Sequence, residues 1–161
     1  MVRQYSDNDI DAVMQIWLDT NIQAHHFIPS DYWRTNCNMV REMLPHAEIY
    51  VHEDDCTKQI DGFIGLNDDY IEGVFVKETM QSKGIGKQLL NHAKEFKSKL
   101  KLSVYQENEK AIKFYLREKF SIQSERPPLI MAVLFVPVKI CGSADDIINI
   151  ENAYITAVRN T

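Results

Sequence analysis

The chain has little cysteine, and its three cysteines lie far apart. Cys37, Cys56 and Cys141 are odd in number and form no close pair. Zinc sites and redox dithiols instead use ligands or thiols that are a few residues apart. We therefore expect reduced thiols, no metal site and a cytoplasmic location.

Long apolar runs are also absent. No segment approaches the roughly 20 consecutive apolar residues that a membrane-spanning helix requires, and the residues after Met1 are too polar for an export signal. The net charge of −5 disfavours nucleic acid as a partner, because that affinity comes mainly from Lys and Arg that neutralise phosphates. We expect neither a membrane nor a nucleic-acid ligand.

The chain does contain enough apolar sequence for one core. With 161 residues, 45% of them hydrophobic, a single domain over residues 1–161 is expected. Helical and alternating spacing of apolar residues predicts helices from Ser6 through Trp17 and at 30–44, strands at 47–51, 60–66 and 71–76, a helix at 84–98, a strand at 100–104 and a helix at 108–119. The strand–helix–strand order after residue 71 predicts one parallel pair in a mixed sheet.

The C-terminal residues 127–161 follow a different pattern. The apolar run from Leu129 to Val136 is interpreted as a strand. Apolar residues then recur at helical spacing, which predicts an added helix after Ser143; they are Ile147, Ile150, Tyr154 and Val158. Two alternatives stay open for its apolar face, packing on this domain or pairing with a second copy in a homodimer.

A glycine-containing loop precedes the predicted helix at 84–98. It reads Gln81-Ser82-Lys83-Gly84-Ile85-Gly86-Lys87. Unpaired N–H groups at a helix start attract anions, and glycine lets a phosphate approach the backbone. The P-loop and dinucleotide patterns both fail here, because Gln88 and Leu89 stand where they require Ser or Thr and Gly. The alternative is a plain turn that packs the helix closely.

This loop and the order of the elements resemble the GNAT superfamily of N-acetyltransferases. Gln81, Gly84 and Gly86 match its Gln/Arg-x-x-Gly-x-Gly/Ala signature. The resemblance covers about residues 1–126 and includes Phe75 and Val76 before the loop and the spacing of Asn108, Ala111 and Tyr115 after it. It implies an α/β (α+β) fold with a mixed, mainly antiparallel central sheet flanked by helices.

The resemblance also implies acetyl-CoA as the donor, with CoA as the product. The loop amides would hold its diphosphate, and the preceding strand would pair with its pantetheine arm. The implied cofactor-binding residues are Phe75, Val76, Gln81, Ser82, Lys83, Gly84, Ile85, Gly86, Lys87, Asn108, Ala111 and Tyr115. Backbone near Val76 would stabilise the oxyanion.

Two residues are candidates for proton transfer, and no metal is required. By resemblance, Tyr115 is the general acid toward the CoA sulfur, although a core aromatic is the alternative; Asn108 could equally be a helix cap. Glu72 lies on the strand leading to the loop and is a candidate general base. A solvated strand position is its equal alternative.

The acceptor is expected to be a primary amine of a small molecule or a protein. Its binding residues are placed between the first two helices, at His25, His26, Phe27 and Trp33, without a catalytic role for the histidines. Lys119 departs from the family pattern, which has glycine there, and implies either a strained helix end or a different ending. That departure leaves a second function open, a catalytically idle CoA-binding or protein-interaction module.

Overall fold

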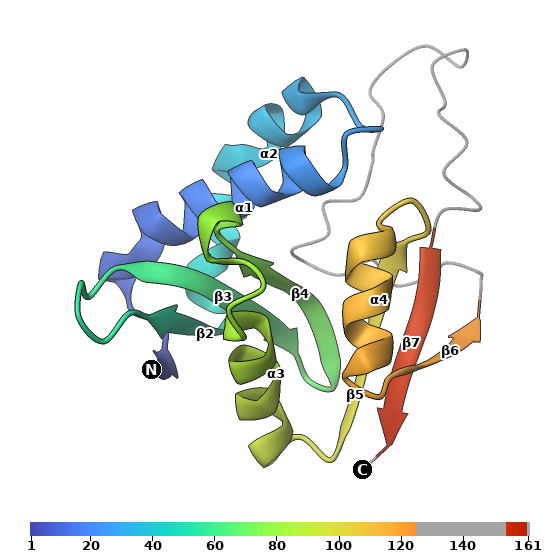
Figure 1. Ribbon diagram of the computed structural model, residues 1–161. Helices are drawn as coiled ribbons and strands as arrows, with labels where there is room; N and C mark the ends of the chain where they lie inside the picture. The colour runs from blue at the N-terminus through green and yellow to red at the C-terminus, as the bar shows by residue number, and fades with distance from the viewer. Residues whose placement is uncertain (125–153, 161) are drawn as a thin grey trace.

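The computed structural model describes residues 1–124 and 154–160. Within them one sheet holds seven strands: β1 (Val2–Gln4), β2 (Glu48–Glu53), β3 (Ile60–Asn67), β4 (Tyr70–Val76), β5 (Lys99–Tyr105), β6 (Ser121–Ser124) and β7 (Tyr154–Asn160). Their spatial order is β1-β2-β3-β4-β5-β7-β6 (Figure 1). All neighbouring strands pair antiparallel except β4 and β5, which are parallel.

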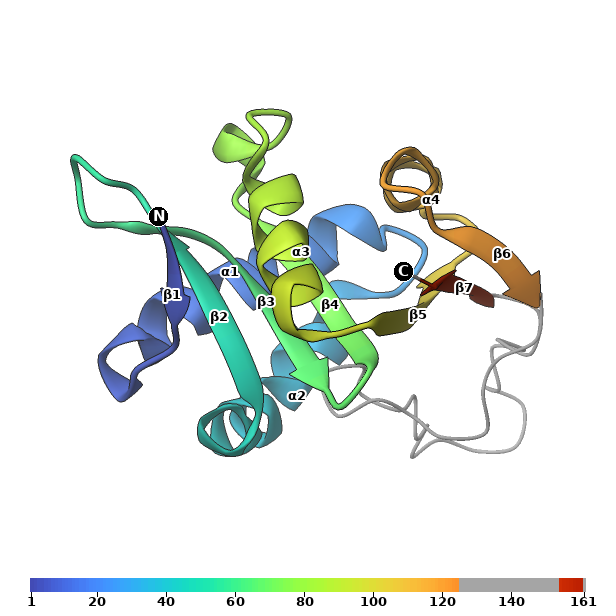
Figure 2. The same ribbon diagram turned by 90° about the horizontal axis from the view of Figure 1, so that it is seen from below.

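Helices cover both faces of this sheet. They are α1 (Ile10–Ala24), α2 (Ser30–Met43), α3 (Ile85–Phe96) and α4 (Glu109–Arg117), with short 3-10 turns η1 (Asp7–Asp9), η2 (Leu44–His46) and η3 (Glu78–Met80). Figure 2 shows α3 and α4 on one side and α1 and α2 on the other. None of the described helices is both long and apolar enough to cross a lipid bilayer.

Alternation along the strands divides the core into two layers. On β3, Phe63 packs with Trp17 and Trp33 of α1 and α2, whereas the next residue, Ile64, packs with Leu89 of α3. Successive strand residues point to opposite faces, so a single buried strand supplies both layers. The sheet is thereby fixed between the two helix pairs.

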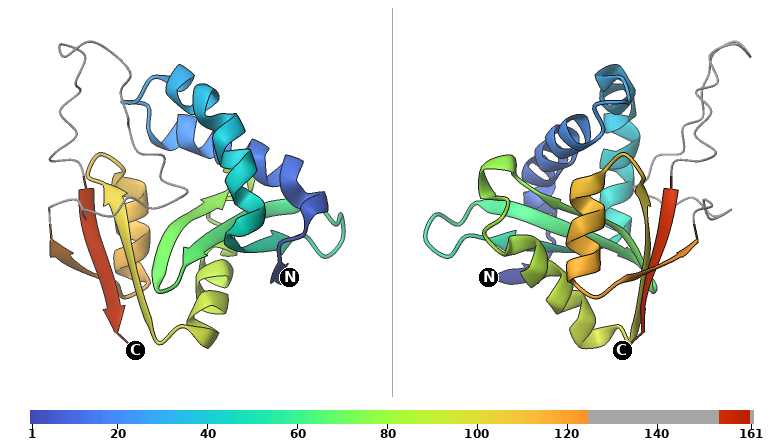
Figure 3. Two further views of the ribbon diagram at one scale, coloured as in Figure 1. Left: turned by 180° about the vertical axis from the view of Figure 1, so that it is seen from behind. Right: turned by 45° about the vertical axis from the view of Figure 1, so that its right-hand side comes forward.

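The parallel pair β4–β5 is short. The described strands pair at Tyr70 with Lys101 and at Ile71 with Leu102, and Figure 3 shows them separating toward the C-terminal end of β4. Beyond Ile71, β4 continues to pair with β3 on its other side. Within the described residues, one edge of β4 therefore has no strand partner around Val74–Val76.

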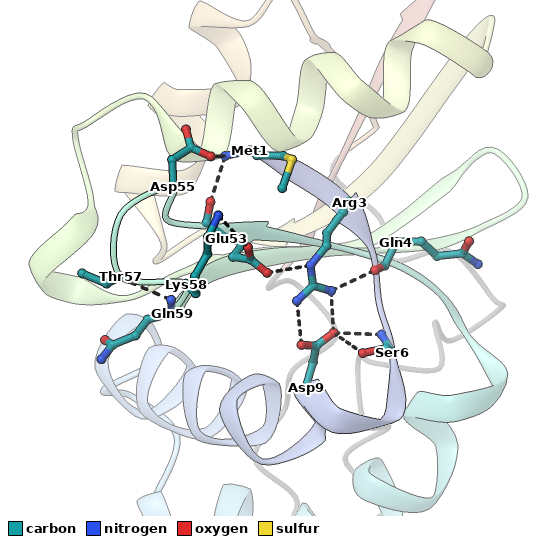
Figure 4. Close-up of polar contacts among 10 residues, drawn as sticks. All are labelled: Met1, Arg3, Gln4, Ser6, Asp9, Glu53, Asp55, Thr57, Lys58 and Gln59. Atoms are coloured by element: carbon teal, nitrogen blue, oxygen red, sulfur yellow. Dashed lines mark hydrogen bonds and ion pairs between the residues drawn. The ribbon is translucent and has the colours of Figure 1, made fainter.

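An ion-pair network anchors the N-terminus (Figure 4). Arg3 donates two hydrogen bonds to Asp9, at 2.8 and 2.9 Å, and one to Glu53 at 2.8 Å. The backbone N–H of Ser6 also donates to Asp9, at 2.8 Å, as in a capping box at the start of a helix. These bonds, with Arg3 first, hold the pKa of the Asp9 carboxyl below its ordinary value. They tie β1 to η1 and β2.

The predicted helices and strands between residues 6 and 119 are confirmed with shifted boundaries. β1 and β6 were not foreseen from the sequence. The added C-terminal helix is wrong where it can be compared, because Tyr154 and Val158 lie in β7. This segment is rich in β-branched residues and pairs with β5 along its whole length, which outweighs the helical spacing. The predicted strand 129–136 and residues 143–153 lie outside the described residues.

Candidate active site

A cavity of about 840 Å³ lies where β4 ends. Its walls come from the C-terminal half of β4, the loop and first turn of α3, one face of α4 and the last turn of α1. It collects these predicted residues: His25, Phe75, Val76, Gln81, Ser82, Gly84, Gly86, Lys87, Asn108, Ala111 and Tyr115. Segments far apart in the sequence thus meet in one site.

The loop before α3 has the conformation that an anion site requires. Ser82 and Gly84 both adopt left-handed backbone angles, with φ of 62° and 86°, and such alternation turns successive N–H groups toward one side. Only glycine adopts such a positive φ without strain. A Cβ at Gly84 would meet no atom within 4 Å, so the reason for glycine there is its backbone angle and not a lack of space. The N–H groups of the first turn of α3 have no intrahelical acceptor. The loop and helix start therefore present donors and partial positive charge.

Gly86 has a different role from Gly84. A Cβ at Gly86 would lie 3.3 Å from Cζ of Phe114, which is tighter than an ordinary contact. The residue thus allows α3 and α4 to approach closely, whereas the packing alternative for this loop places the helix close to the sheet, where a Cβ would lie at an ordinary 3.8 Å from Val74. The close approach keeps the loop and α4 on opposite walls of one cavity.

Gln81 joins three elements at the cavity mouth. Its Nε2 donates to the backbone oxygen of Val76 at 3.0 Å, and Nζ of Lys110 on α4 donates to its Oε1. The side chain therefore links the end of β4, the loop and α4. Lys110 also lines the cavity, and sequence reasoning did not single it out.

Tyr115 is held in the cavity wall by aromatic packing. Its side chain is buried, and its ring centroid lies 5.1 Å from that of Phe114 and 5.6 Å from that of Phe120. Burial raises the pKa of the Tyr115 phenol well above its ordinary value. The hydroxyl is therefore protonated at neutral pH and is available as a proton donor.

The ends of α4 bear out two expectations from the sequence. Asn108 caps the helix, because its Oδ1 accepts the Ala111 N–H at 3.1 Å, and it lines the cavity as well. Lys119 takes a left-handed φ of 69°. Its N–H donates to Leu116 and that of Phe120 to Tyr115, both at 3.0 Å, a Schellman ending in which glycine is usual. The strain expected at Lys119 is confirmed.

Several predicted site residues do not reach the cavity. Glu72 is 1% exposed and is not part of the lining, so its role as general base stays a prediction without geometric support. Ile85 is buried in the core under α3, and the exposed Lys83 contacts Met80, although their backbone amides belong to the loop. The remaining acceptor candidates also lie outside the lining: His26, Phe27 and Trp33.

The last turn of α1 contributes residues that the sequence analysis missed. Thr20, Asn21 and Ala24 line the cavity beside His25. Thr20 and Asn21 are buried and donate to backbone oxygens of Ile16 and Trp17. Their spacing was the available signal, because residues i, i+1, i+4 and i+5 share one helix face. The cavity wall on this side therefore begins within α1, before the predicted acceptor residues.

Comparisons with known proteins agree with this site. Residues 45–122 match the family model described as an acetyltransferase (GNAT) domain. Over 124 residues the chain is 32% identical to the peptidyl-lysine N-acetyltransferase YiaC of Escherichia coli K12, a match covering 76% of this chain and 84% of the relative. It is 24% identical over 121 residues to the peptidyl-lysine N-acetyltransferase YjaB of the same strain, covering 75% and 82%.

Solved structures share the fold at low sequence identity. The PaiA N-acetyltransferase of Thermoplasma acidophilum, solved with coenzyme A, has a TM-score of 0.75 at 15% identity and covers 100% of this chain and 98% of its own. Spermidine N-acetyltransferase of Vibrio cholerae, solved with CoA and spermine, has a TM-score of 0.64 at 16% identity, covering 99% and 94%.

The chain therefore belongs to the GNAT superfamily of N-acetyltransferases. It is an acetyl-CoA-dependent acyltransferase that moves an acetyl group to an amine. The mixed, mainly antiparallel sheet expected from the sequence is confirmed.

Proposed function

We propose that this enzyme acetylates the side-chain amine of lysine residues in proteins. The support is the 32% identity over most of both chains to a relative named as a peptidyl-lysine N-acetyltransferase, together with a second relative of the same name. The carrying observation in the structure is one cavity lined both by the loop before α3 and by the buried Tyr115.

The described residues fit acetyl-CoA in both charge and shape. Backbone amides from Gln81 to Lys87 would bind its diphosphate, with the ammonium groups of Lys87 and Lys110 nearby on the cavity wall. The edge of β4 around Val74–Val76, which has no strand partner, would receive the amide groups of the pantetheine arm. When bound there, acetyl-CoA supplies the thioester whose acetyl group is transferred.

Two groups of this chain would then act on the reaction. The Tyr115 hydroxyl keeps its proton because burial disfavours the phenolate, and it would give that proton to the departing sulfur. A backbone N–H near Val76 would donate to the developing oxyanion. The cytoplasmic location, the lack of nucleic-acid partners and the homodimer remain predictions from the sequence.

The test combines a turnover assay with calorimetry. Acetyl-CoA and a lysine-containing peptide are incubated with enzyme, and free thiol is followed over time. Tyr115→Phe should lower lysine-dependent thiol release by about 10²- to 10⁴-fold, the usual contribution of a positioned acid, and leave CoA binding unchanged. Tyr50→Phe is the matched control, because Tyr50 is half-buried on β2 outside the cavity.

A second variant tests the loop. Gly84→Trp places a large side chain in the open space at the start of α3 and should weaken CoA binding in calorimetry. Unchanged turnover in Tyr115→Phe would remove that residue from the mechanism. Wild-type enzyme that binds CoA but releases no thiol with any lysine peptide would instead be an idle module or an enzyme for another amine.

A further inference from the structure

One part of the cavity has no role in the chemistry proposed above. We define the α1 arm as the part lined by Thr20, Asn21, Ala24 and His25, which faces Phe75 and Val76 at the end of β4. The other walls carry the groups assigned to the donor. An acceptor amine that approaches from the α1 arm therefore meets the end of β4, where the acetyl group is expected.

The α1 arm offers no negative charge to a cationic amine. Glu118 is the single acidic residue among the described lining residues, and it lies at the far end of α4. Other charged lining residues are basic, such as Lys87, Lys110 and Arg117. A protonated amine would thus find no carboxylate among the residues that define this arm.

His25 is the ionisable residue of the α1 arm, and aromatic neighbours fix its ring. The imidazole stacks on Trp33 at 5.3 Å between centroids and meets the edge of Tyr105 at 4.8 Å and that of Phe27 at 5.8 Å. It is 7% exposed, and its enclosed Nδ1 makes no hydrogen bond of ordinary geometry within the described part of the chain, although the Asn21 carbonyl lies close enough to act on the ring. With the proton on Nδ1 toward that carbonyl, the lone pair is on Nε2. A buried polar side chain that lacks a partner is costly unless a ligand supplies one.

The charge state of this ring follows from its surroundings. Burial lowers the pKa of His25 to about 4, the Asn21 carbonyl opposes this only in part, and the neighbouring His26 acts in the same direction as burial. The ring is therefore neutral at physiological pH. A neutral imidazole keeps one nitrogen lone pair, so it accepts a hydrogen bond from an N–H.

We infer that His25 is the acceptor-binding residue of this enzyme and takes a hydrogen bond from the neutral amine of lysine. This inference rests on the proposed function and names the form of the substrate that is bound. A neutral amine has the free electron pair that attack on the thioester requires, and its N–H groups need an acceptor. The α1 arm supplies that acceptor without a carboxylate, so it selects the deprotonated lysine amine.

The test measures lysine-dependent kinetics in two His25 variants. Nα-acetyl-L-lysine amide is the acceptor probe. His25→Phe keeps the aromatic packing and removes the lone pair, whereas His25→Gln loses the ring and keeps a hydrogen-bond acceptor. We expect kcat/KM for the probe to fall about 10- to 100-fold in His25→Phe and to fall less in His25→Gln. Affinity for CoA in calorimetry should stay at the wild-type value in both.

If the His25 ring only supports packing, the two variants should rank in the opposite order of kcat/KM. Phe would then preserve activity and Gln would lose it, and that order overturns the inference. Thermal melting of each variant shows whether it is folded, and the Gln variant keeps the test decisive if the Phe variant is not. His46→Phe is the matched control, because His46 is exposed in η2 and does not line the cavity. Wild-type enzyme that ignores the probe would contradict the proposed function instead.

Discussion

Phe120 holds Tyr115 through both its ring and its backbone. The ring centroids lie 5.6 Å apart, and the Phe120 N–H donates to the Tyr115 carbonyl at 3.0 Å. The ring contact joins the last residue of the Schellman ending to the residue five positions before it, as such endings commonly do. The position of the proposed acid therefore depends on a residue that lies beyond the helix.

Removing the Phe120 ring should lower both the free energy of unfolding and the rate of acetyl transfer. Phe120 is 3% exposed, so Phe120→Ala should lower the free energy of unfolding by about 3 kcal/mol, as large-to-small core substitutions do. We also expect a lower kcat with unchanged CoA affinity, because Tyr115 loses its support. Urea unfolding and thiol release measure the two effects. Phe120→Leu is the milder control, and an Ala variant as stable and active as wild type would contradict the packing argument.

Lys119→Gly should stabilise the protein. The φ of 69° at Lys119 costs a residue with a Cβ about 1 kcal/mol relative to glycine. The change should raise the melting temperature by about 2–4 °C, given the size of the chain. Lys119→Ala keeps the Cβ and should show no such gain. Equal melting temperatures for the Gly and Ala variants would mean that the charge or length of the side chain, and not its backbone, sets the effect.

The buried His25 should make stability depend on pH. Its pKa is lowered from 6.5 to about 4 by burial, so the unfolded chain binds the proton more readily than the folded one. This stability is therefore present above pH 6.5 and is lost as the pH falls toward 4, at up to about 1.4 kcal/mol per pH unit. Urea unfolding at pH 7 and pH 5 should show a smaller loss in His25→Phe than in wild type. His46→Phe should behave as wild type does.

Breaking the N-terminal ion-pair network should destabilise the fold. Arg3→Met leaves the Asp9 carboxylate, whose side chain is 8% exposed, without its guanidinium, at a cost of about 3 kcal/mol. The double variant with Asp9→Asn should recover part of this loss in urea unfolding at pH 7. Because Arg3 lowers the pKa of Asp9, the effect of Arg3→Met should also shrink as the pH falls below the ordinary carboxyl value. A double variant no more stable than Arg3→Met would exclude the unpaired charge as the cause.

Spacing in the sequence was enough to predict most of the fold but not all of it. Alternation at Ile49 and Val51 marks β2 correctly, because one side of that strand faces a core. Tyr154 and Val158 are four residues apart, which suits a helix as well as a strand. Their pairing with β5, about 50 residues earlier in the chain, decides between the two, and no local pattern carries that information.

The difference between local spacing and long-range strand pairing also explains which site residues the sequence could identify. Gln81 and Gly84 could be found because they match the family's loop signature, and Tyr115 because the family resemblance extends to its spacing from Asn108 and Ala111; both patterns are local. Glu72 could not be judged, because the pairing of β3 with β4 is irregular there: Gly65 pairs with Gly73 and Leu66 with Ile71, so Glu72 is the extra residue of a bulge. A bulge interrupts the two-residue period and redirects side chains. The alternation therefore cannot tell whether Glu72 faces a ligand or the core.

The short pairing of β4 with β5 makes resistance to unfolding and proteolysis depend on bound ligand. Two residue pairs join the first four strands of the sheet to the last three, the fewest between any neighbouring strands among the described residues; we call this junction the seam. A ligand that lies in the seam and bonds to both sides acts as a removable cross-link. Binding to the folded state alone raises its stability in proportion to the logarithm of ligand concentration. Resistance of the enzyme to unfolding and proteolysis therefore follows the supply of its own acetyl donor.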